Sequence, residues 1–147
     1  MGAHPYWYTV KYKANTQAAL DELREREFRA GRYNPAMPFI DFPITNASPA
    51  PGPQHDSIEE AMEEADADGT RSILDIHSIS DEPEFFTATP VPDELLEELY
   101  GTTQPTRSQV EENMDFLEDL ERGHALYTTL YKDGQPDELF FAGYSVD

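Results

Sequence analysis

Residues 125–146 read ALYTTLYKDGQPDELFFAGYSV, and this stretch decides the fold. Its two halves are rich in β-branched and aromatic residues, which favour strands. Asp133-Gly134 between them is a favoured two-residue hairpin turn. Pro136 lies at the mouth of the hairpin, where a strand tolerates the loss of one backbone donor. The sequence therefore predicts a C-terminal β-hairpin with strands at 125–132 and 138–146.

The N-terminal region adds a strand and a helix to this hairpin. Residues 6–12 read YWYTVKY, an aromatic and β-branched run that predicts a strand. Asn15 or Thr16 is suited to cap a helix that runs to Ala30, and Gly31 supplies the left-handed residue that ends it. Aromatic residues in both terminal regions suggest that the first strand lies beside the hairpin.

Residues 33–56 hold six prolines and predict a long irregular segment, because proline lacks an amide proton and restricts the residue before it. The part at 37–44, MPFIDFPI, is strongly apolar, so we expect it to pack onto the body of the protein. The part at 45–56 is more polar and is expected to be looser.

The middle of the chain predicts shorter elements. Ser57 followed by Glu60 has the spacing of a capping box and opens a helix to about Asp66. Strands are expected at 71–79 and 85–89, and a helix from Asp93 that ends at Gly101. A further helix begins at Thr106 or Ser108 and ends before Gly123. An apolar stripe marks this last helix: Val110, Met114, Leu117 and Leu120.

This order of elements predicts a single α+β domain over 1–147. We expect a largely antiparallel sheet of four to five strands, built from the N-terminal strand and the C-terminal hairpin. About four helices are expected to pack on one face of the sheet, since strands and helices do not alternate regularly.

The composition is strongly acidic. Thirty Asp and Glu against ten Lys and Arg give a formal net charge of −20 at pH 7. Residues 1–32 carry a net charge of +2 and residues 33–147 one of −22. Such a surface disfavours nucleic acid backbones and anionic membranes as partners. With no cysteine, no signal peptide and no long apolar run, we expect a cytoplasmic protein.

The charge favours a binding protein that docks a basic protein partner, as an inhibitor of the immunity-protein or antitoxin type does. Electrostatic complementarity raises association rates by orders of magnitude, which benefits an inhibitor that must act quickly. The acids expected to face the partner lie on two predicted helices: Glu59, Glu60, Glu63, Glu64, Glu111, Glu112, Asp115, Glu118 and Asp119. A nucleic-acid mimic and a structural subunit remain alternatives.

A small enzyme or a binder of anionic ligands is a further alternative. Arg29, Arg32 and Tyr33 flank a helix end and form the main basic site. Asp75 and His77 alternate on the strand expected at 71–79, where the carboxylate would orient the imidazole for base catalysis. The chain lacks a G-x-S-x-G elbow, a P-loop and a dinucleotide-binding glycine motif, so we expect no catalytic residues and no cofactor.

Glu64, Asp66 and Asp68 before Gly69 resemble the opening of a calcium-binding loop, in which oxygen ligands alternate before a sharp turn. The resemblance weakens further along the chain, because Arg71 stands where an apolar residue is usual. A solvent-exposed helix end therefore explains this stretch better than a metal site, and we expect no bound metal.

Overall fold

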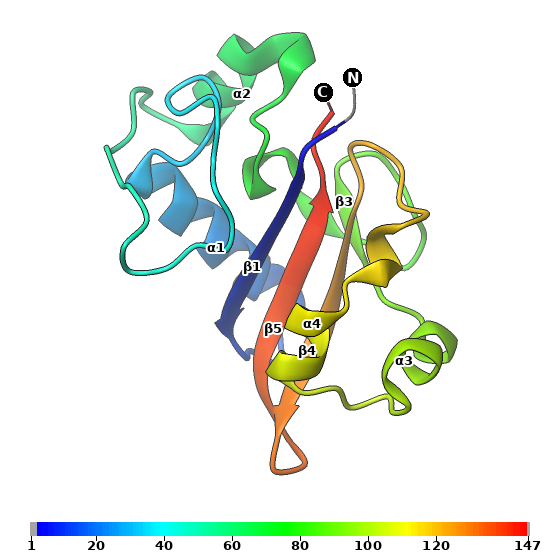
Figure 1. Ribbon diagram of the computed structural model, residues 1–147. Helices are drawn as coiled ribbons and strands as arrows, with labels where there is room; N and C mark the ends of the chain where they lie inside the picture. Colours follow the sequence, from blue (N-terminus) through cyan, green and yellow to red (C-terminus); the bar gives the residue numbers. More distant parts are fainter. Residues whose placement is uncertain (1–2, 147) are drawn as a thin grey trace.

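The computed structural model describes residues 3–146 (Figure 1). Its five strands form one sheet in the order β1-β5-β4-β3-β2. The strands are β1 (Pro5–Lys11), β2 (Ser78–Ile79), β3 (Thr87–Pro90), β4 (Ala125–Lys132) and β5 (Gln135–Tyr144). The α-helices are α1 (Thr16–Ala30), α2 (Ile58–Ala65), α3 (Asp93–Tyr100) and α4 (Arg107–Glu112). Three 3-10 turns complete the order: η1 (Asp66–Asp68), η2 (Ile73–Asp75) and η3 (Asp115–Leu117).

The C-terminal hairpin and the strand beside it are confirmed. β1 pairs with β5, and β5 with β4, both antiparallel. Asp133 and Gly134 have φ angles of 53° and 78°, the left-handed pair of a two-residue turn that matches the twist of the strands. β5 begins at Gln135, earlier than expected, and an irregularity at Leu130 and Tyr131 absorbs the extra residues.

The sheet as a whole is mixed, so the expectation of a largely antiparallel sheet is correct only for its two long pairings. β3 pairs parallel to β4, and β2 parallel to β3. Parallel neighbours need a crossover connection, and α3, α4 and η3 supply it between β3 and β4.

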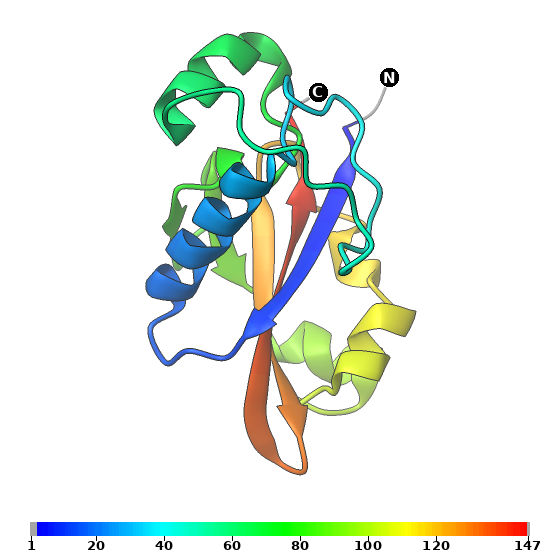
Figure 2. The ribbon, with the colours of Figure 1, turned by 90° about the vertical axis from the view of Figure 1, so that its left-hand side faces the viewer.

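The helices cover both faces of the sheet, so the expectation that they pack on one face is wrong. α1 packs through Leu20 and Leu23 onto the face that carries Phe141, whereas Leu96 of α3 and Val110 of α4 pack with Phe140 on the other face. The cause is β5, whose alternating side chains are buried on both faces. Figure 2 shows the sheet between α1 on one side and α3 and α4 on the other.

α1 is confirmed at both ends. The side chain of Asn15 accepts a hydrogen bond from Ala18 N, and Gly31 has a φ of 78°. Gly31 also lies against Gly52, so close that a Cβ on Gly31 would stand 2.1 Å from the Gly52 oxygen. This contact holds the 46–54 part of the irregular segment against the end of α1.

The strand expected at 71–79 is wrong over most of its length, because only Ser78–Ile79 forms one. Arg71 has a φ of 55°, and the side chain of Ser72 accepts a hydrogen bond from Leu74 N to open the 3-10 turn η2. Short polar side chains that bond to nearby backbone compete with the ladder of a sheet. The strand expected at 85–89 is found as β3, which begins two residues later and ends one residue later than expected.

The helix expected from 106 to 122 ends at Glu112. Its capping box of Thr106 and Gln109 is confirmed, whereas the Ser108 alternative is wrong because the helix begins at Arg107. Asn113 is extended, and its side chain accepts a hydrogen bond from Asp115 N, which stops the helix. The four residues of the predicted apolar stripe still pack in or against the core cluster that contains Leu96 and Phe140.

Residues 33–56 contain no helix or strand, as predicted. Phe42 and Ile44 pack against the core, whereas Phe39 is 78% exposed. The expected packing of 37–44 is therefore confirmed for its second half. Within residues 3–146, no helix combines the length and apolar character needed to cross a bilayer.

Candidate functional site

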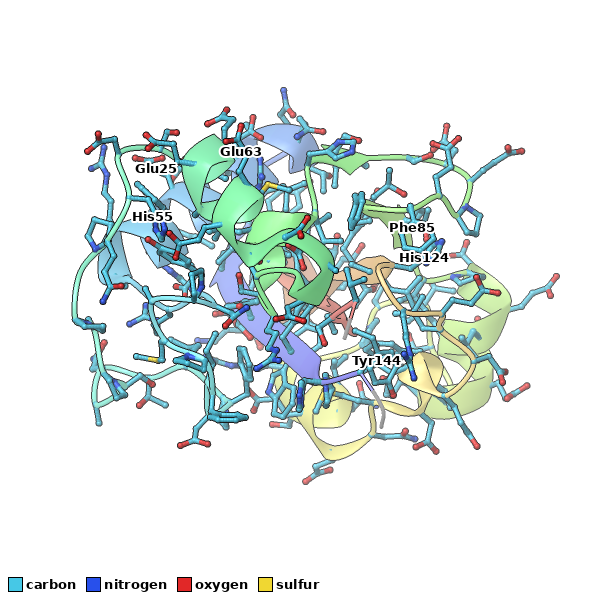
Figure 3. The ribbon with its side chains drawn as sticks, turned by 90° about the horizontal axis from the view of Figure 1, so that it is seen from above. Glu25, His55, Glu63, Phe85, His124 and Tyr144 are labelled. Atoms are coloured by element: carbon cyan, nitrogen blue, oxygen red, sulfur yellow. The ribbon has the colours of Figure 1, made fainter. Side chains whose placement is uncertain are left out.

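α2 and its flanks present a long run of exposed acids. Ser57 caps the helix by accepting a hydrogen bond from Glu60 N, and Ala61 and Ala65 are buried against the body. With its apolar side fixed, the helix directs its carboxylates to solvent, as seen for Glu63 in Figure 3. We call residues 56–68 the acidic segment. Its seven acids are all exposed, and it contains no Lys or Arg: Asp56, Glu59, Glu60, Glu63, Glu64, Asp66 and Asp68.

The nine acids expected to face a partner do not form one surface. All nine are exposed. Four lie on α2, and the other five lie on α4, on η3 and just after η3, on the opposite face of the sheet. Glu111 of the second group is paired with Arg107 at 3.1 Å. The acidic segment is therefore the better candidate, since its carboxylates lie together on one helix and its flanks, and none of them forms an ion pair with Lys or Arg within the described residues.

Two exposed aromatic side chains lie at the same end of the sheet as α2. Phe85 is 58% exposed and precedes β3, and its ring stacks at a tilt on His124, 5.2 Å away between centroids. Phe39 lies over the guanidinium of Arg71, 5.8 Å away. Figure 3 shows Phe85 and His124 together beside the end of the sheet that α2 covers. Exposed aromatics near charge are common anchors of protein interfaces.

The predicted basic site at Arg29, Arg32 and Tyr33 is not assembled. Arg29 is exposed and pairs with Glu25 at 2.8 Å. Arg32 is buried and binds the fully buried carboxylate of Glu27 with two nitrogens, at 2.7 and 2.9 Å. This bond raises the pKa of Arg32.

Tyr33 is also buried, and its hydroxyl contacts His55 Nδ1 at 2.8 Å. Arg32 and Tyr33 therefore stabilise the fold around the irregular segment, and their polar groups are already satisfied by the protein.

Asp75 and His77 are likewise not brought together. Asp75 is buried in η2 and accepts hydrogen bonds from the backbone N and the hydroxyl of Thr70, both at 2.9 Å. Burial raises the pKa of Asp75, although the bonds from Thr70 oppose the shift. His77 is exposed and follows the turn. The pairing was inferred from a strand that does not form at these residues.

The calcium-like stretch does not converge either. Glu64, Asp66 and Asp68 are all exposed, and Glu64 contacts His55 at 3.3 Å. Across residues 3–146, no group of three or more His, Cys, Asp or Glu side chains is arranged to hold a metal ion.

A basic site that the sequence did not predict lies along the outer edge of β1. One hollow of about 200 Å³ lies between Trp7, residues 43–46 and Arg107. A second of about 400 Å³ lies between β1 and α1. Thr9 and Arg26 line both, so we treat the two hollows as one feature, the basic groove. Its charged lining combines five cations with three acids: Lys11, Lys13, Arg26, Arg32, Arg107, Glu22, Glu111 and Glu138.

Half of the Lys and Arg residues of the chain thus line the basic groove, whereas only a tenth of the Asp and Glu residues of the chain do. The groove draws its cations from β1, α1, α4 and the turns after β1 and α1, which are separate in the sequence. The only advance signals were the positive charge of residues 1–32 and the place of Arg32 in the expected basic site.

No protein-family model matches this chain, and neither a curated protein nor a solved structure matches it. A function is therefore inferred from the chemistry of these surfaces.

Proposed function

We propose that this chain is a binding protein that captures a basic protein partner on the acidic segment, as an inhibitor of the immunity-protein or antitoxin type does. The observation that carries the proposal is the run of seven exposed acids at 56–68, mounted on a helix whose other side is buried. A fixed array of like charge steers an oppositely charged partner and raises its association rate by about 10- to 1,000-fold.

The buried side of α2 fixes the helix on the body of the protein, which favours a role of its acids in recognition over a role in solubility alone. Charges on a fixed helix pay little conformational entropy when a partner binds, because the backbone that carries them is already ordered. Phe85 and Phe39 add exposed apolar surface at the same end of the molecule, suited to anchor a partner after the charges have steered it.

The test compares two helices of equal length. One variant carries Glu59→Gln, Glu60→Gln, Glu63→Gln and Glu64→Gln on α2. Its matched control carries Asp93→Asn, Glu94→Gln, Glu97→Gln and Glu98→Gln on α3, which also has eight residues and four exposed acids. Both variants lose the same charge, so they separate the contribution of position from that of net charge.

The partner is first captured from a lysate of the native host at low salt, identified by mass spectrometry and purified. Its association rate is then measured with each variant. We expect the α2 variant to lose at least about tenfold in association rate and the α3 control to lose far less. Equal losses in both variants would show a nonspecific charge effect and contradict the proposal, as would the failure to obtain a saturable basic partner.

A further inference from the structure

The edge of β1 that faces away from β5 has unpaired backbone groups. Tyr12 N donates to Asp137 O, and Ser145 N donates to His4 O, so the even-numbered residues of β1 bond to β5. Trp7, Thr9 and Lys11 therefore direct their N–H and C=O groups away from the sheet. Within residues 3–146 these groups have no hydrogen-bond partner.

Strand edges of this kind bind extended peptides. A peptide adds a strand by backbone hydrogen bonds, and its alternate side chains enter pockets on the two sides. Five residues from Trp7 to Lys11 offer an edge about 13 Å long at the usual rise of a strand. Figure 2 shows this edge of β1 facing the viewer between α1 and α4, with the irregular segment crossing beside its upper part.

The two sides of the basic groove differ chemically. On the α1 side, Val10, Ala19 and Leu23 form the apolar part of the larger hollow. Its lining also includes the charged side chains of Lys13, Glu22 and Arg26. Lys11 also lines this hollow, is exposed and has no ion-pair partner within the described residues. By the strand alternation its side chain leaves β1 on the side that carries Trp7 and Thr9.

Arg107 reaches that same side from α4, where it contacts Glu138 at 3.5 Å. It is 55% exposed, and ion pairs with so much exposure to water exchange easily for a ligand.

We infer that the outer edge of β1 binds an extended peptide segment in which apolar residues alternate with acidic ones. Backbone bonds form with Trp7, Thr9 and Lys11. The apolar side chains enter the hollow beside α1, and the acidic ones approach Lys11 and Arg107. Charge complementarity decides between occupants, because a second copy of β1 would bring its own Lys11 against the cations of the same groove.

The net charge of the protein does not prevent this binding at physiological salt. The Debye length is about 8 Å at 0.15 M, so acids on distant helices are largely screened. The groove itself is lined by five cations and three acids, which leaves an excess of positive charge beside the ligand. Binding through the groove is independent of the acidic segment, since the acids of 56–68 do not line it.

The test uses a capped seven-residue peptide of alternating glutamate and valine, with a peptide of alternating lysine and valine as the control, both at 0.15 M salt. The readouts are the fluorescence of Trp7, the one tryptophan of the chain, and hydrogen exchange of the β1 amides. We expect saturable binding of the glutamate peptide below about 1 mM, at least tenfold tighter than the lysine peptide. Exchange should slow at Trp7, Thr9 and Lys11.

Two variants then test the contacts. Thr9→Pro removes an outward N–H at an edge position where proline is tolerated, and it should weaken binding roughly tenfold. Lys11→Glu should also weaken it, whereas Arg29→Glu, which changes an exposed cation of α1 that lines neither hollow, should not. Circular dichroism and thermal melting verify that each variant is folded, and Lys11→Glu tests the site even where Thr9→Pro unfolds the chain.

Three results would overturn the inference. The first is the absence of saturable binding of the glutamate peptide up to millimolar concentration. The second is equal binding of the lysine peptide, or protection of amides elsewhere than on β1. The third is a dimer in sedimentation equilibrium that Lys11→Glu stabilises or Thr9→Pro dissociates, which would make the occupant a second copy of this chain.

Discussion

The acidic segment presents seven exposed carboxylates on one helix and its flanks, whereas the basic groove collects five cations from three elements and the turns between them around a bare strand edge. Most of those cations already contact an acid, such as Lys13 with Glu22 at 2.6 Å. The acids of the segment have few such contacts. The acidic segment therefore offers mostly unpaired carboxylates that can steer a partner. The basic groove offers backbone hydrogen bonds, and its charge selects which peptide binds.

The comparison shows how a chain with a net charge of −20 can still hold a local site of opposite character. The chain has few cations, and half of them line the groove where α1, β1 and α4 meet. Acids are abundant, and they occupy the outer sides of helices on both faces of the sheet.

The largest expected effect concerns the ion pair that supports the groove. Glu27→Gln leaves the buried guanidinium of Arg32 without its carboxylate, and breaking a buried pair in this way costs about 3–5 kcal/mol. Urea unfolding measures it. Glu25→Gln, which removes an exposed pair with Arg29, is the control and should cost less than about 1 kcal/mol. Similar costs for both variants would show that the buried pair does not fix this region.

The next effect concerns the segment that borders the groove. Gly31→Ala places a methyl group against the backbone of Gly52 and should cost about 1–3 kcal/mol more than Gly101→Ala. Gly101 is the matched control, because its φ of 73° is also left-handed while nothing lies within 4 Å of the added Cβ. Thermal unfolding of both variants tests the contact, and equal costs would mean that 46–54 moves away without penalty.

Asp75 differs from the acids of the acidic segment because its side chain is buried. Its folded pKa lies above its ordinary value of 3.8, because burial disfavours the charged form. The folded protein therefore binds the proton more tightly than the unfolded chain, and stability falls as pH rises from 3.8 through the raised pKa.

Asp75→Asn lacks this titration, so its stability should change less with pH across that window. Urea midpoints measured on both proteins from below pH 3.8 to neutral pH test this. Parallel curves for the two would show that Asp75 titrates alike in the folded and unfolded states.

The smallest expected effect lies within α2. Glu60 stands in the first turn, where the helix dipole favours a negative charge, and Glu63 stands near the last turn, where it does not. Glu60→Gln should lower stability and Glu63→Gln should raise it, each by about 0.3–1 kcal/mol at low salt. Both effects should shrink in 1 M salt. Effects of the same sign would show that repulsion within the acidic segment outweighs the dipole.

The sequence predicted the regions in which local signals and tertiary packing agree. Asp133-Gly134 fixed the hairpin, Asn15 and Gly31 fixed both ends of α1, and the prolines of 33–56 excluded regular structure. The sequence failed at 71–79 because the side chains of Thr70 and Ser72 bond locally and form a turn. It failed at 113 for the same reason, although the residues of the apolar stripe still pack in or against the core.

The candidate sites show the same difference between local sequence signals and tertiary packing. The acids of α2 lie together in the sequence, so their exposure followed from the helical pattern. The basic groove was not predictable, because Lys11, Arg26 and Arg107 meet only once α1 and α4 lie on either side of β1. The pairing of Asp75 with His77 was expected from the alternation of side chains along a strand, and these two residues do not lie on a strand.

Carboxyl footprinting of the complex with the captured partner tests the central claim most directly. Carbodiimide labelling followed by mass spectrometry reports how reactive each carboxylate is with and without the partner. The account predicts strong protection of Glu59, Glu60 and Glu63, while Glu94 and Glu97 of α3 stay reactive. Equal protection of both helices, or protection confined to α3 or to the acids of the basic groove, would contradict it.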